Sequence, residues 1–126
     1  MNTPYELLGG EAGLRNLANA LYDAMDKLPE AKEIRVMHSD DLSSVKEKLF
    51  EYLSGWMGGP SLYSQKYGTI CLTDPHSHYK INADHRDQWL LCMNHALEQI
   101  GASDEVKTML KEPMFHLADT VKNTAE

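Results

Sequence analysis

The chain is organised around the stretch GGPSLYSQKYGTICLTDPHSHYKINADHRDQW, residues 58–89, which separates two segments with helical periodicity. The opening Gly-Gly-Pro ends the preceding helix, because glycine tolerates positive φ and proline cannot continue a helix. From Ser61 to Lys80 no apolar stripe recurs at helical spacing, and the short β-favouring run 69–73 has no second strand with which to pair. The aromatic and aliphatic residues of this stretch therefore favour a segment ordered by a ligand over a disordered one.

The composition is ordinary for one globular domain, which we expect to span residues 1–126. Of the 126 residues, 42% are hydrophobic and 25% are charged. A net charge of -7 argues against nucleic acid or an anionic membrane as a partner, because phosphate binding needs a basic face. The chain has only two cysteines, no apolar signal segment at its start and no apolar run near the ~20 residues that span a bilayer. We therefore expect a cytoplasmic protein.

Apolar residues at helical spacing predict an all-α fold with five or six helices and no sheet. The expected helices run from about Glu11 to Lys27, from Pro29 to about Met37, from Leu42 to Trp56, from Ala83 to Gly101, and from Ser103 or Asp104 to about Val121. Pro113 is expected to kink or split the last of them, because it lacks an N–H group and clashes with the preceding turn.

Two features of these helices bear on the site. Tyr22 lies at the edge of a buried stripe, where spacing alone leaves it either as a packing residue or as a hydroxyl directed along the core. The helix from Leu42 to Trp56 has one apolar face, and its start has three candidate caps, Ser39, Asp40 and the Ser44-x-x-Glu47 box. Its opposite face is expected to be a solvated charge face made of Lys46, Glu47, Lys48 and Glu51.

Residues 71–92 contain donors that suit a metal. Imidazole and thiolate donors of the kind that zinc prefers are available at Cys71, His76, His78 and Cys92. The spacing lacks a paired C-x-x-C, so the zinc site remains an alternative, as does a partner-binding helical module without any cofactor. A disulfide between the two cysteines is disfavoured by the expected compartment.

Haem is a further option, since it needs one neutral imidazole for its iron and a wide slot of apolar and aromatic side chains. The chain resembles the truncated haemoglobins, most closely their group II, which has a two-over-two helical globin fold around haem. The resemblance covers nearly the whole chain and rests on residues 5–10 (YELLGG), 21–23 (LYD), 53–60 (LSGWMGGP) followed by Tyr63, and 76–93 (HSHYKINADHRDQWLLCM).

The resemblance implies a role for particular residues on each side of the haem. It identifies His76 as the proximal iron ligand, because this histidine precedes Ile81 by five residues and Trp89 by thirteen. On the distal side, Tyr22 and Trp89 face the bound gas and His38 adds a third polar group. The family more often has Tyr or Phe in place of this histidine, so the distal polarity here is expected to depend on pH.

The remaining pocket residues also follow from the resemblance. The positions that match the distal helix carry apolar side chains, in place of the familiar distal histidine or glutamine. The expected pocket consists of Val45, Leu49, Tyr52, Leu53, Tyr67, Leu72, Tyr79 and Met93, with Lys48 and His78, and also Tyr67, as candidate partners of the propionates.

The function implied by the resemblance is reversible binding of oxygen, nitric oxide and carbon monoxide at ferrous haem. No Cys-x-x-Cys-His motif is present for covalent attachment, so the cofactor is expected to be haem b. Oxidation of nitric oxide or a peroxidase-like reaction, supported by an unknown reductase, is the corresponding enzymatic hypothesis. The same pocket serves storage, sensing, scavenging and catalysis, so the sequence does not choose among them.

Overall fold

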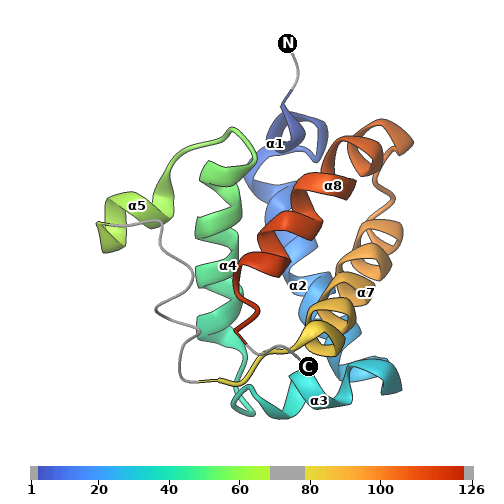
Figure 1. Cartoon of the computed structure of the whole chain (residues 1–126). Helices are drawn as coiled ribbons and strands as arrows, with labels where there is room; N and C mark the ends of the chain where they lie inside the picture. The colour runs from blue at the N-terminus through green and yellow to red at the C-terminus, as the bar shows by residue number, and fades with distance from the viewer. Residues whose placement is uncertain (1–2, 69–78, 124–126) are drawn as a thin grey trace.

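The structure is a computed structural model that describes residues 3–68 and 79–123, and every regular element within them is helical (Figure 1). The elements are α1 (Pro4–Leu7), α2 (Gly10–Lys27), the 3-10 turn η1 (Pro29–Ala31), α3 (Lys32–Val36), α4 (Ser43–Trp56), α5 (Leu62–Tyr67), α7 (Ala83–Gln99) and α8 (Asp104–Thr120). The prediction of an all-α fold is confirmed. None of the helices in the described part of the chain is long and apolar enough to cross a membrane.

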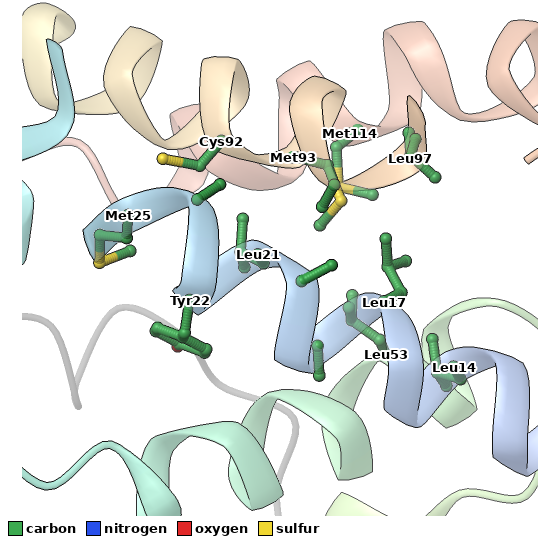
Figure 2. Packing of buried hydrophobic residues seen from close by; sticks show 14 of the residues in the cluster. Leu14, Leu17, Leu21, Tyr22, Met25, Leu53, Cys92, Met93, Leu97 and Met114 are labelled. Atoms are coloured by element: carbon green, nitrogen blue, oxygen red, sulfur yellow. The ribbon is translucent and has the colours of Figure 1, made fainter. Parts of the chain in front are cut away.

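Helix α2 forms the centre of the fold, with α4 packed on one side and α7 on the other (Figures 1 and 2). Leu14, Leu17 and Leu21 are completely buried along it. Each such side chain contributes roughly 1.5–3 kcal/mol when it leaves water. Four methionines are also buried in this core, namely Met25, Met57, Met93 and Met114. The unbranched thioether side chain fills irregular gaps between helices, so the core combines rigid leucines with adaptable methionines.

Two short helices depart from the prediction. Helix α5 lies in the stretch for which the sequence predicted no helical periodicity, and α1 was not predicted at all. At the start of α1 the Thr3 side chain accepts a hydrogen bond from the N–H of Glu6 at 3.2 Å, and the Glu6 carboxylate accepts from the N–H of Thr3 at 3.0 Å. This reciprocal capping stabilises a helix too short to show an apolar stripe. Helix α5 ends at Gly68, whose φ of +72° favours glycine.

The predicted helix ends are partly corrected. Ser103 caps α8 as expected, and its side chain accepts from the N–H of Val106 at 3.3 Å. None of the three predicted caps of α4 is used, because the Asp41 carboxylate accepts from the N–H of Ser43 at 2.9 Å. Pro113 does not split α8, which continues through it to Thr120. The proline is exposed, so the carbonyl group that it leaves unbonded can face water.

The solvated charge face predicted for α4 is wrong at Glu51. This side chain is buried beneath α5, with 7% of its residue surface exposed, and its Oε2 accepts a hydrogen bond from Nζ of Lys66 at 3.2 Å. Glu47 is also paired, because Nη1 of Arg15 donates to its Oε1 at 2.9 Å and ties α4 to α2. The prediction failed because the covering helix α5 was not expected.

Gly13 in the first turns of α2 gives a test of the packing. The chain reverses at Gly9 and Gly10, both with positive φ, so the carbonyl group of Leu8 folds back against Gly13. A Cβ atom at this position would overlap that carbonyl oxygen.

We expect Gly13→Ala to lower the free energy of unfolding by about 1–3 kcal/mol, because a backbone overlap cannot be relieved by a rotamer change. This loss exceeds the roughly 0.8–1.0 kcal/mol that alanine gains over glycine in helix propensity. Urea unfolding measures the change, and Asn19→Ala on the exposed face of α2 is the control, expected to stay within about 0.5 kcal/mol. A Gly13→Ala protein more stable than wild type would contradict the packing described.

Candidate functional site

Tyr22 and His38 come together although they lie on different elements. Tyr22 in α2 is 6% exposed and points to the α4 side of the helix, away from Cys92 and Met93 (Figure 2). His38 follows α3, and its ring meets the Tyr22 ring edge-on, with the centroids 5.7 Å apart and the planes at 72°. Burial raises the pKa of the Tyr22 hydroxyl above its ordinary value, so this group keeps its proton at neutral pH.

The backbone of α3 determines which nitrogen of His38 carries a proton. Its Nδ1 lies 2.7 Å from the carbonyl oxygen of Ile34. A carbonyl oxygen can only accept, so Nδ1 donates, and Nε2 of the neutral ring is then an acceptor. The neutral His38 is therefore suited to receive the Tyr22 hydroxyl proton and to orient it. Direct donation by Nε2 requires the charged imidazolium.

Trp89, predicted to face the bound gas together with Tyr22 and His38, lies on α7. The ring is half-buried and packs against the edge of the core. No residue within 3–68 or 79–123 accepts a hydrogen bond from its indole N–H. An indole N–H is a donor only, so it can stabilise a ligand that carries negative charge.

The pocket residues predicted on α4 and α7 fall into two groups. Val45, Leu49 and Tyr52 are half-buried along one face of α4, whereas Leu53 and Met93 are completely buried in the core between the helices. The first group can contact a ligand directly. The second group belongs to the hydrophobic core.

Three tyrosines from α4 and α5 form a series of ring contacts, the first edge-on and the second tilted. The rings of Tyr52 and Tyr63 lie 5.4 Å apart, and those of Tyr63 and Tyr67 lie 4.6 Å apart. Tyr63 thus contacts Tyr52, a predicted pocket residue, although the predicted pocket left Tyr63 out and the resemblance itself used it. Tyr67 and Tyr79 are exposed by 39% and 45%, and Lys48 is exposed on α4, in keeping with groups at the rim of a pocket. His76, His78 and Leu72 lie outside the described residues, so their predicted roles stay predictions.

The described part of the site fits haem better than zinc. Half-buried apolar side chains from α4 and α7 form the kind of wall that a flat apolar macrocycle covers. In contrast, no three or more His, Cys, Asp or Glu side chains among residues 3–68 and 79–123 are placed to hold a metal ion. Of the four zinc donors considered, only Cys92 is described. It is completely buried, and desolvation raises the pKa of its thiol to about 11, which disfavours the thiolate that zinc needs.

The buried hydroxyl of Tyr22 has a consequence for stability at alkaline pH. The unfolded chain ionises this tyrosine above about pH 10, whereas the folded protein keeps it neutral to higher pH. The stabilisation is complete below the unfolded pKa and is lost as the pH rises towards the folded pKa.

We therefore expect the stability advantage of Tyr22→Phe over wild type to grow above about pH 10, by up to about 1.4 kcal/mol per pH unit. Urea unfolding at a series of pH values measures the difference. Tyr79→Phe, at an exposed position, is the matched control. Parallel pH profiles for wild type and Tyr22→Phe would show that the hydroxyl is not buried as described.

Comparison with known proteins agrees with this geometry. A family model described as bacterial-like globin matches residues 3–123. A group 2 truncated haemoglobin of Bacillus subtilis is 31% identical over 109 residues, which cover 86% of this chain and 80% of the relative.

Two solved structures are similar over almost their full lengths. The group II 2-on-2 haemoglobin of Agrobacterium tumefaciens superposes with a TM-score of 0.92 at 35% identity, covering 98% of this chain and 96% of that one. The cold-adapted truncated haemoglobin of Pseudoalteromonas haloplanktis also gives 0.92, at 40% identity, with 98% and 99% covered. The chain therefore belongs to the bacterial-like globin family and has the two-over-two fold of the group II truncated haemoglobins.

Proposed function

We propose that this protein holds haem b non-covalently through His76 and binds oxygen, nitric oxide and carbon monoxide reversibly on the opposite side. Haem is the cofactor that membership of the globin family implies. When bound, it supplies an iron atom with one position for the protein and one for the gas. The observation that carries the proposal is the edge-on contact of the buried Tyr22 with the half-buried His38, near half-buried apolar side chains of α4.

The distal wall leaves few groups that can interact with a polar ligand. Val45 and Leu49, which we propose line the pocket, are half-buried on α4, and neither can donate a hydrogen bond. Donors aimed at a ligand that gathers negative charge are most effective in such a desolvated surrounding. The indole N–H of Trp89 meets this requirement directly.

Tyr22 acts differently from Trp89 because its single proton has another acceptor nearby. With Nδ1 of His38 bound to the Ile34 carbonyl group, the neutral Nε2 competes with the gas for the Tyr22 hydroxyl proton. Trp89 then serves as the principal donor to the gas, and Tyr22 adjusts the strength of the interaction. The half-buried α4 side chains exclude water from the same space.

A spectrum of the purified protein tests the proposal. We expect a Soret band, and we expect the band of the reduced protein to shift on adding oxygen and to return when oxygen is removed. A colourless protein that binds one equivalent of zinc would instead support the Cys/His zinc module. A colourless protein without metal would support the partner-binding module.

The same preparation separates gas carriage from turnover. Stopped-flow mixing of the oxygenated protein with nitric oxide measures whether oxygen is consumed faster than it dissociates. Rapid consumption with nitrate as product would support a detoxifying role that depends on a reductase. Consumption limited by oxygen dissociation would support binding, storage or transport.

A further inference from the structure

Gln88 connects the helix that carries Trp89 to the segment that carries His38. Its Oε1 accepts a hydrogen bond from the backbone N–H of Ile34 at 3.3 Å. Its Nε2 donates to Oε1 of Glu33 at 3.1 Å. These two bonds join α7 to α3 over more than fifty positions in sequence.

The N–H of Ile34 is a group that needs such a partner. It belongs to the first turn of α3, where backbone N–H groups have no carbonyl acceptor within the helix. The residue before the helix, Ala31, has no side chain that can accept a hydrogen bond. Gln88 therefore caps α3 from another helix.

The orientation of the Gln88 amide is fixed by its two partners. A backbone N–H can only donate, so the amide oxygen must face Ile34, and a carboxylate can only accept, so the amide nitrogen must face Glu33. Glu33 is held in turn by His85, whose Nε2 lies 3.4 Å from its Oε2. Nδ1 of His85 accepts from the N–H of Asn82 at 3.2 Å, which leaves the proton of the neutral ring on Nε2, facing Glu33.

Ile34 links this cap to the distal pair. Its N–H is bound by Gln88, and its carbonyl oxygen accepts the Nδ1 proton of His38. Gln88 also immediately precedes Trp89 in α7. One amide side chain thus lies next in sequence to the principal donor and two hydrogen bonds away from the imidazole that competes for the Tyr22 proton.

We propose that Gln88, oriented by Glu33, is a positioning residue that keeps His38 in place to accept the Tyr22 hydroxyl proton. The inference rests on the gas-binding function proposed above and adds to it a residue that touches neither haem nor gas. The proposal predicts the direction in which the rate of oxygen release changes. When the Gln88 cap is lost, the His38 segment loosens, the Tyr22 hydroxyl becomes available to the gas, and oxygen leaves more slowly.

The first experiment measures oxygen dissociation from the haem-loaded protein by stopped flow. We expect Gln88→Leu to slow dissociation roughly 2- to 10-fold, the effect of one additional hydrogen bond to the ligand. Gln99→Leu, at an exposed position of the same helix, is the matched control and should leave the rate unchanged.

Double variants show whether the effect passes through His38 and Tyr22. In a His38→Phe background and in a Tyr22→Phe background, Gln88→Leu should have no further effect on the rate. An equal effect in either background would overturn the proposal, because it would indicate a general loosening of the fold. A faster rate in the single Gln88→Leu variant would overturn it as well.

A conservative exchange keeps the proposal testable if Gln88→Leu fails to fold. Gln88→Glu retains an acceptor for the Ile34 N–H but places two carboxylates together, and adding Glu33→Gln restores a donor opposite an acceptor. We expect the single variant to slow oxygen release and the double variant Gln88→Glu/Glu33→Gln to regain the wild-type rate. Failure of the double variant to recover would overturn the proposal.

Amide hydrogen exchange separates this inference from the proposed function. In Gln88→Leu, the Ile34 N–H should exchange faster than in wild type, whereas exchange in the middle of α2 should not change. If the protein binds no oxygen but Gln88→Leu shows this faster exchange, the proposed function is refuted, whereas the conclusion that Gln88 caps α3 still holds. Faster exchange with an unchanged oxygen rate would refute the positioning role alone.

Discussion

Oxygen should dissociate roughly 10- to 100-fold faster from Trp89→Phe than from the wild-type protein, because a hydrogen bond to a charged group contributes about 1.5–3 kcal/mol. Phenylalanine keeps most of the bulk of the indole ring and removes its N–H. Neither Val45 nor Leu49 can replace this donor, and in the proposed arrangement the neutral His38 competes with the gas for the Tyr22 hydroxyl proton. Stopped-flow displacement of oxygen by carbon monoxide measures the rate.

The chain offers a matched control for this substitution. Trp56, the other tryptophan, is half-buried at the end of α4, and Trp56→Phe should leave the oxygen rate within about a factor of two. Tyr22→Phe should have a smaller or opposite effect. An unchanged rate in Trp89→Phe and also in Tyr22→Phe/Trp89→Phe would show that these distal groups do not hold the gas.

His76→Ala should abolish the proximal bond and with it the spectrum of five-coordinate ferrous haem. The methyl group of alanine has no lone pair that can bind iron, so we expect the bond to be lost completely rather than weakened. His78→Ala, two residues along the chain, is the control and should retain that spectrum. Added imidazole should restore the ferrous spectrum of His76→Ala by occupying the space of the missing side chain. If His78→Ala lost the spectrum and His76→Ala kept it, the proximal ligand would be His78.

The long helices could be predicted from the sequence because the apolar spacing repeats over several helical turns in each of them. The expected range from Glu11 to Lys27 differs from α2 by one residue, and Ala83 begins α7 as expected. Helices α1 and α5 span four and six residues, too few for a stripe to repeat. Their signals were local instead, namely the reciprocal capping residues of α1 and the left-handed glycine after α5.

Burial depends on tertiary packing, which a single helix does not reveal. Glu51 lies among charged neighbours on α4, and its pattern is that of a solvated face. It is buried because α5 folds back over it and brings Lys66 within hydrogen-bond distance. The same covering helix brings Tyr63 against Tyr52, one of the predicted pocket residues.

Part of the candidate site could be predicted from the sequence, and part could not. The resemblance to group II truncated haemoglobins predicted Tyr22 and His38 as distal partners, and their rings are in contact. Which nitrogen of His38 carries the proton could not be predicted, because it depends on the backbone carbonyl group of Ile34. Every residue has such a group, so the contact leaves no signal in the sequence. The capping role of Gln88 was equally hidden, since the helix it caps lies far away in sequence.

The buried methionines of the core matter for a protein that handles oxygen. Peroxide converts a thioether into a polar sulfoxide, and such a group at Met25 or Met93 would put an unpaired oxygen among leucines. Their burial hinders this reaction. Met109 is 39% exposed on α8 and is expected to react before the buried methionines, at a position where a sulfoxide can be hydrated. Peptide mass spectrometry after mild peroxide treatment should find oxidation at Met109 well before the core, so a surface thioether consumes oxidant at little cost to the fold.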